Sequence, residues 1–389
     1  MENMFKRTLL GAAIATAAMG SISAYAADAD AVAVEKLKES FSYEVYGVIA
    51  MQALTRDYNE AGKALWAEDS NWKLNNESRI GFRGSKDFAN GPKFIWQIES
   101  GYVGGSSAAP GADGKLGVRD TFVGFEGDSW GKIRIGRVLT PIYEIIDWPG
   151  SNPGLGDVYD WGYGIAGAPY QDRQSDTVRW DSPTWGGFSV DLAFGRGDTV
   201  ADANSNWGGA AVHYAIGPVT LQAAYERNHS SKSGKPAGYE FDSETGTSKP
   251  TPAVAAQDWI NDTYLVGIQG NFENGLGFFA QYKMMEADSQ VAGIADESQN
   301  AYTAGLMYNI ADYQFKVGYA ANEDLERDGK KVAYTDDSVI SGQVMYFIDP
   351  SAVVYTRVRH VERADEASKR VDNENPEFME YSVGVEYYF

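Results

Sequence analysis

The sequence predicts an all-β fold, a 16-stranded antiparallel β-barrel that spans a membrane. Apolar and polar residues alternate with a period of two through most of the chain, as in strands with one apolar face. Short turns alternate with long polar connections, as a series of hairpins across a membrane requires. The mean hydropathy is only −0.37, which suits strands that turn half of their residues toward water.

The first 26 residues have the features of an export signal. Lys6 and Arg7 precede the small and apolar run TLLGAAIATAAMGSISAYA, and Ala24-Tyr25-Ala26 offers a small-residue cleavage site. The order of charge, apolar run and cleavage site favours a signal peptide over a buried N-terminal helix. We therefore assign residues 1–26 to a signal peptide and residues 43–389 to the barrel.

Residues 27–42 form an N-terminal extension before the first expected strand. A chain terminus of this kind is usually a spacer without fixed structure. Val34, Leu37 and Phe41 recur at helical spacing, so the alternative is a short helix that plugs one mouth of the barrel. Both interpretations stay open from the sequence.

The composition excludes several classes of protein. The net charge of −21 argues against a nucleic-acid partner, which requires basic surface to displace counterions. No cysteine is present, so the chain folds without disulfides, metal–thiolate sites or a cysteine nucleophile. After the signal, no apolar stretch approaches the ~20 residues of a helical membrane span. We expect no cofactor and no metal.

Sixteen segments are expected to form the strands. Between them, tight turns such as EGDSW, SPTWGG, NFENG and IDPS alternate with long polar stretches such as 55–73, 138–173, 229–257 and 364–376. The strands are expected at 43–54, 74–86, 93–102, 116–126, 130–137, 174–182, 186–195, 206–216, 218–228, 258–271, 275–286, 298–310, 312–322, 334–348, 351–363 and 377–389.

The aromatic residues favour a membrane barrel over a soluble β-sandwich, which would alternate in the same way. Many of them fall at or near the short turns, where an aromatic girdle at a membrane interface would lie; they are Trp130, Trp185, Tyr313, Phe347 and Phe389. Sixteen strands enclose an aqueous channel, whereas about eight would be filled by side chains.

The chain ends on an alternating strand, YSVGVEYYF, with no polar tail. Tyr381, Val383, Val385, Tyr387 and Phe389 share one face. A terminal strand of a soluble sheet usually frays or carries polar residues. This apolar face therefore predicts a strand that faces an apolar medium to its last residue.

The sequence resembles a trimeric general porin of the Gram-negative outer membrane. The resemblance rests on four stretches, 78–101, 118–137, 172–195 and the closing nine residues. It implies short periplasmic turns, long extracellular loops and a homotrimer surrounded by outer-membrane lipid and lipopolysaccharide. It also implies that the barrel-assembly machinery reads the terminal strand, with Val385, Tyr387 and Phe389 as the signal.

The resemblance further implies that the third long loop, residues 138–173, folds inward and narrows the channel. The family's Pro-Glu-Phe-Gly-Gly type turn is only partly matched by PGLGD at 153–157, so the acidic side of the constriction falls to Glu144, Asp147, Asp157 and Asp160. The matching basic wall is Arg79, Arg119 and Arg173, extended by Arg83 and Arg134. In the alternation of lumen-facing and outward-facing residues on the strand of Arg119, Phe122 is expected to face outward. Asp120 breaks this alternation, because it places an acid on the outward face.

The expected function is passive diffusion of small hydrophilic solutes and ions. An oligosaccharide-specific channel is the alternative, because sugars stack on aromatic rings and the third loop holds Trp148, Tyr159, Trp161 and Tyr163. A barrel enzyme or an adhesin is a more distant alternative. Only three histidines are present, and no serine sits in a recognisable nucleophile motif, so we expect no catalytic site.

Overall fold

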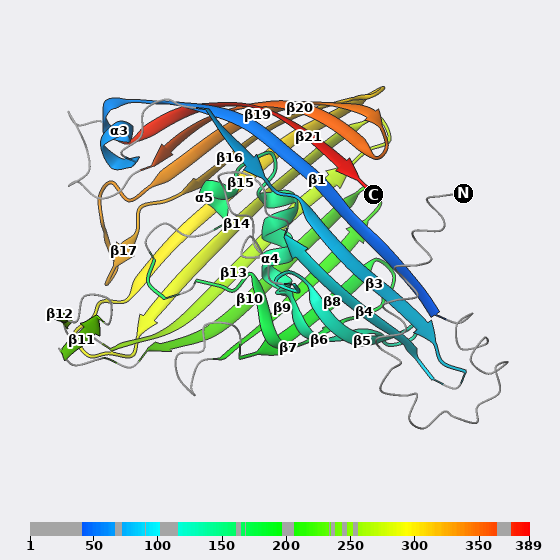
Figure 1. Ribbon diagram of the computed structural model, residues 1–389, viewed down its shortest axis with the longest axis horizontal. Helices are drawn as coiled ribbons and strands as arrows, with labels where there is room; N and C mark the ends of the chain where they lie inside the picture. The colour runs from blue at the N-terminus through cyan, green and yellow to red at the C-terminus, as the bar shows by residue number, and fades with distance from the viewer. Residues whose placement is uncertain are drawn as a thin grey trace.

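The computed structural model shows a β-barrel whose long strands run obliquely across the view of Figure 1. It describes residues 41–66, 72–89, 91–101, 116–160, 165–167, 169–196, 206–232, 234, 238–242, 247–251, 256–363 and 375–389. Residues 1–26, the predicted signal peptide, and residues 27–40 of the N-terminal extension lie outside these ranges. Phe41 and Ser42 belong to the first strand, so the barrel begins two residues earlier than expected.

Sixteen antiparallel strands close into one barrel, and the predicted fold class is confirmed. β1 pairs with β21 on one side and with β2 and β3 on the other, which closes the sheet. The barrel strands are β1 (Phe41–Tyr58), β2 and β3, which together form one strand (Trp72–Asn76 and Arg79–Asp87), β4 (Lys93–Gly101), β5 (Thr121–Gly127), β6 (Gly131–Leu139), β7 (Arg173–Asp181), β8 (Phe188–Gly195), β9 (Asn206–Ile216), β10 (Val219–Lys232), β13 (Gln257–Asn271), β14 (Leu276–Ser289), β15 (Glu297–Ile310), β16 (Tyr313–Asn322), β19 (Asp337–Asp349), β20 (Ala352–Arg363) and β21 (Glu377–Tyr388).

The second strand is interrupted where a continuous one was expected. At Glu77 and Ser78 the chain leaves the regular ladder, and the Ser78 Oγ accepts a hydrogen bond from the Ala50 N–H at 2.9 Å. The Asn76 side chain accepts from the Ser78 N–H at 2.9 Å. Serine and asparagine side chains compete with strand pairing in this way, which explains the break.

The burial pattern is the reverse of that in a soluble protein. In β16 the outward residues Tyr313, Phe315 and Val317 are exposed, whereas Lys316 and Asn322 on the inner face are buried. The same alternation runs through β14, β15 and β19. Apolar residues therefore cover the outside of the barrel and polar residues fill its interior, as a membrane barrel requires.

Short and long connections alternate around the barrel, as predicted. Turns such as 217–218, 311–312 and 350–351 lie at one end, and the predicted girdle residues lie in or beside such turns. The long connections carry α3 (Glu60–Trp66), the hairpin β11–β12 (Gly238–Asp242 and Thr247–Thr251) and the short strands β17 (Glu326–Arg327) and β18 (Lys330–Lys331). No helix in the described part of the chain has the length and apolar character to cross a membrane.

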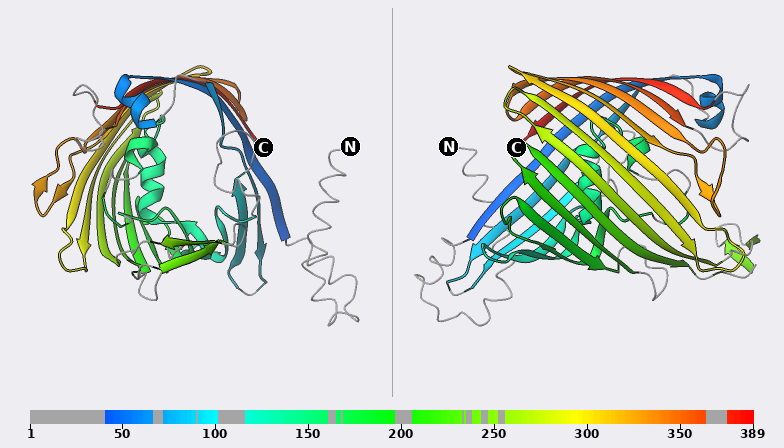
Figure 2. Two further views of the ribbon diagram at one scale, coloured as in Figure 1. Left: turned by 60° about the vertical axis from the view of Figure 1, so that its left-hand side comes forward. Right: turned by 180° about the vertical axis from the view of Figure 1, so that it is seen from behind.

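The third long connection, between β6 and β7, lies inside the ring of strands (Figure 2). It contains α4 (Pro141–Ile145), the π-helical turn η1 (Ile146–Gly150) and α5 (Gly156–Tyr159). Thr140 caps α4, because its Oγ1 accepts from the Tyr143 N–H at 3.3 Å and Pro141 follows at the first helical position. The expected inward-folded loop is therefore present, and we call residues 140–172 the inner loop.

Candidate functional site

The inner loop is fixed to one side of the barrel by hydrogen bonds from wall side chains to loop carbonyls. Short helices leave such carbonyls unpaired, and here the strands supply the missing donors. The donors and acceptors are Thr263 Oγ1 to Pro169, Gln281 Nε2 to Ile145 (2.9 Å), Lys283 Nζ to Tyr159, Thr303 Oγ1 to Gly150 (2.9 Å), Asn322 Nδ2 to Val158 (2.8 Å) and Arg359 Nη1 to Gly154 (2.7 Å). The loop thus covers β13–β20, its helix α4 also lies against β8, β9 and β10, and the opposite wall is left open.

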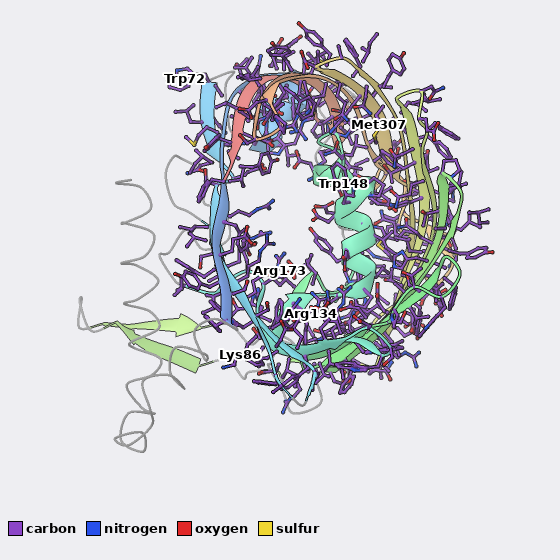
Figure 3. The ribbon with its side chains drawn as sticks, turned by 90° about the vertical axis from the view of Figure 1, so that its right-hand side faces the viewer. Trp72, Lys86, Arg134, Trp148, Arg173 and Met307 are labelled. Carbon is purple, nitrogen blue, oxygen red and sulfur yellow. The ribbon has the colours of Figure 1, made fainter. Side chains whose placement is uncertain are left out.

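One face of the inner loop looks into the lumen. Ile142, Ile145 and Ile146 are fully buried against the wall, whereas Glu144, Asp147 and Trp148 are exposed at helical spacing. Trp148 is 56% exposed, and Figure 3 shows it inside the ring of strands. The loop therefore presents two carboxylates and one aromatic ring to the lumen.

Of the four expected loop acids, Glu144, Asp147 and Asp157 are exposed. Glu144 pairs with Arg179 of β7, and Asp157 pairs with Arg359 of β20 at 2.9 Å. The surrounding loop and wall partly desolvate the Asp157 carboxylate, which by itself would raise its pKa, but the neighbouring Arg359 guanidinium outweighs this effect and holds that pKa below its usual range. Two of these acids therefore tie the loop to the wall as well as facing the lumen.

Asp160 is half-buried, and both of its hydrogen-bond partners belong to the inner loop. Its carboxylate accepts from the Ser151 hydroxyl and from Tyr143 Oη, the latter at 3.3 Å. Burial raises the pKa of Asp160 to about 6, and the charges of Lys283 and Asp147 act on it with opposite signs. These hydrogen bonds hold Asp160 within the loop, and its expected place at the acidic edge of the constriction stays a prediction.

This raised pKa predicts a pH dependence of channel closure. The docked loop binds the Asp160 proton more tightly than a free carboxyl does, so docking weakens as pH rises from about 4 to about 6. We expect transient closures in single-channel recordings to become rarer as pH falls through this window, and Asp160→Asn to remove most of that dependence. A variant that keeps the full pH dependence would contradict this role.

The five expected basic residues are placed on the wall that the inner loop leaves open, and most are paired there. Figure 3 shows Arg134 and Arg173 inside the ring. Their ion pairs are Arg83–Glu44 (2.7 Å), Arg119–Glu99, Arg134–Asp181 (2.7 Å) and Arg173–Asp120 (2.5 Å), and Arg79 on β3 acts electrostatically on Glu99. This wall is therefore a surface of paired charges and carries little free positive charge.

The expectation that Phe122 faces outward is wrong. Its ring lies under the Arg134 guanidinium, 5.5 Å from ring centroid to Cζ, on the lumen face. The regular strand starts only at Thr121, so the alternation cannot be carried across residues 118–120 from Arg119. Asp120 lies on the same face and is explained by its ion pair with Arg173.

Two charged clusters were missed by the sequence reasoning. Arg179, whose side chain is 2% exposed, contacts Glu144 of the loop and Asp181 of its own strand. Arg359 forms a bidentate pair with Glu380 at 2.8 and 2.9 Å, and Arg56 contacts the same carboxylate at 3.0 Å. In the sequence of β20, Val354 and Val358 alternate with Arg357 and Arg359, and this alternation was the available signal.

The aromatic residues of the inner loop do not act as one set. Tyr159 is fully buried, with its ring 4.4 Å from the Lys283 Nζ, so the expectation that it stacks on a solute is wrong. Trp161 and Tyr163 lie outside the described residues. Trp148 is therefore the member of the set whose ring is shown open to the lumen.

The terminal strand has the expected orientation. Val385, Tyr387 and Phe389 are exposed on the outer face, and Phe389 exchanges two backbone hydrogen bonds with Gly47 at 3.0 and 3.1 Å. The last residue is therefore held in the barrel wall. No three histidine or acidic side chains within the described ranges gather closely enough to hold a metal ion.

A family model described as Gram-negative porin matches residues 12–366. The chain belongs to the Gram-negative porin family. The porin is 39% identical over 367 residues to a chitoporin of Vibrio furnissii, covering 92% of this chain and 93% of that one. It is 23% identical over 399 residues to an outer membrane porin protein of Bordetella pertussis, covering 84% and 97%.

The solved structures agree on the fold. An anion-selective porin from Comamonas acidovorans matches with a TM-score of 0.67 at 16% identity, covering 90% of this chain and all of that one. OmpT of Vibrio cholerae, in a trimer form, matches with a TM-score of 0.63 at 15% identity, covering 90% and 100%. The porin is thus an outer-membrane barrel with a water-filled channel, and its family and fold point to transport and away from an enzyme.

Proposed function

We propose that this porin is selective for oligosaccharides of the chitin type, in addition to passing small hydrophilic solutes and ions. The observation that carries the proposal is the exposed ring of Trp148 on the lumen face of the inner loop. Similarity to a chitoporin over nearly the full length of both chains supports it.

The chemistry around Trp148 suits a sugar. An indole ring offers a flat apolar surface to the C–H face of a pyranose, while polar groups at its edge fix the orientation of the ligand. Asp147 and Glu144 lie on the same face of the loop and can accept hydrogen bonds from hydroxyl or amide groups. A chain of N-acetylated sugars presents both kinds of group.

The paired charges of the opposite wall also suit a neutral polar solute. Arg134 and Arg173 are each held by an acid of the same wall, at 2.7 and 2.5 Å. Such pairs keep hydrogen-bonding groups in the lumen without a strong net field across it. A neutral sugar can therefore pass without displacing a fixed counterion.

The test is single-channel recording in a planar bilayer with added sugars. Chitohexaose should interrupt the open current at micromolar to millimolar concentration, and maltohexaose should do so much less. Trp148→Ala should weaken the block about tenfold, because it removes one stacking surface. Trp185→Ala, at the short-turn rim, is the matched control and should leave the block unchanged. Equal responses to both sugars would contradict selectivity.

We further infer that the porin works as a homotrimer, surrounded by outer-membrane lipid and lipopolysaccharide, and that the barrel-assembly machinery recognises its terminal strand. The exposed aromatic end at Tyr387 and Phe389 supports the last point. Opening of the current in three equal steps in the same recordings is the result expected for a trimer, and single steps would contradict it.

A further inference from the structure

The final strand also has a lumen face, and that face ends in a tyrosine. Glu380 and Ser382 of β21 are buried inside the barrel, and Gly384, Glu386 and Tyr388 follow on the same face. Tyr388 is 45% exposed, although its neighbours Tyr387 and Phe389 face outward. The aromatic end of the chain thus places one ring in the channel.

A second tyrosine lies against the same stretch of wall. Tyr355 shares the lumen face of β20 with Arg357 and Arg359 and is directly opposite Gly384 in the ladder. A Cβ at Gly384 would collide with the Tyr355 ring, so the ring lies over the backbone of β21 at this position. Glycine at this position therefore allows an aromatic surface to cover two strands.

Polar groups flank the two rings. Tyr388 Oη donates to Glu386 Oε2 at 2.5 Å, between the positions of the rings on β21. Val48 is paired with Tyr388 on one side and with Arg79 on the other, which puts Arg79 in the same row of the wall. Gly384 and Tyr388 are four residues apart, about 13 Å along the strand. This length suits two to three sugar rings.

We propose that Tyr355 and Tyr388, with Glu386 and Arg79, form a second carbohydrate-contact site in the channel. It lies between the tip of the inner loop, which Arg359 holds through Gly154, and the short-turn mouth. An oligosaccharide that leaves Trp148 toward this mouth meets the two rings next. The inference rests on the proposed selectivity for oligosaccharides.

The test uses the full-length porin in planar bilayers with chitohexaose added to each side in turn. Tyr355→Leu and Tyr388→Leu keep the bulk of the side chain and remove the flat ring. Each should shorten the residence time of the blocking sugar about threefold to tenfold. Tyr388→Phe should retain most of the block, and Tyr381→Leu, at an exposed outward position of the same strand, should leave it unchanged.

The outcomes separate the two proposals. Unchanged residence times in both leucine variants, together with a weakened block in Trp148→Ala, would overturn the second site and leave the proposed function standing. No block of the unmodified porin would overturn both. If Tyr388→Leu does not assemble because the terminal strand is altered, Tyr355→Leu, far from the chain end, decides the question.

Discussion

Glu380→Gln is expected to lower the free energy of unfolding of the porin by about 3–5 kcal/mol, the usual cost of removing one partner from a buried ion pair. The Glu380 carboxylate is fully buried and neutralises Arg359 and Arg56 at 2.8–3.0 Å. Without it, the guanidinium groups of Arg359, Arg56 and Arg357, the last 3.8 Å from the carboxylate, lose their shared counter-charge, and among the described residues Asp157 of the inner loop still pairs with Arg359. Heat-dependent loss of the folded band in detergent, with tryptophan fluorescence as a second probe, measures the change.

The control is a carboxylate–arginine pair of similar geometry in a different environment. Glu44 and Arg83 are 2.7 Å apart, but both side chains are more than half exposed. An exposed pair contributes about 0–1 kcal/mol, so Glu44→Gln should barely move the unfolding transition. Equal shifts in the two variants would show that burial of Glu380 does not set the strength of its cluster.

The architecture could be predicted because its causes are local and repeated. Alternation in strands such as 312–322 defines an apolar face, and a membrane barrel is the arrangement in which such a face can remain exposed. The order of short and long connections then fixes which ends of the strands lie together. The terminal run at 381–389 required only its own period of two to be placed correctly.

The details of the site could be predicted only in part. Alternation gave the wrong face for Phe122 because its strand starts only at Thr121, later than expected, and for the same reason it left Asp120 as an exception to the pattern. A loop has no such period, so nothing in the sequence separated exposed Trp148 from buried Tyr159. That separation depends on which side of the loop meets the wall, and long-range contacts such as the one between Lys283 and Tyr159 determine it.

Lys283→Met is the variant expected to change the current most. The Lys283 ammonium is fully buried beneath the inner loop, where it donates to the Tyr159 carbonyl and to Tyr170 Oη and lies 4.4 and 4.7 Å from the two rings. Methionine fills the space but removes both hydrogen bonds that Lys283 donates, and the loss for the buried Tyr159 carbonyl alone costs about 1–3 kcal/mol. That is enough to let a loop that was almost always docked leave the wall for a measurable fraction of the time.

An inner loop that detaches from the wall moves into the open part of the lumen and narrows the channel. We therefore expect Lys283→Met to show frequent transient closures and a lower mean conductance at voltages where the unmodified channel stays open. Lys132→Met is the control, because Lys132 lies on β6 and pairs with Asp181 at 3.8 Å on the wall opposite the loop. Steady current through Lys283→Met would show that the remaining wall donors, such as Gln281 and Thr303, suffice to hold the loop.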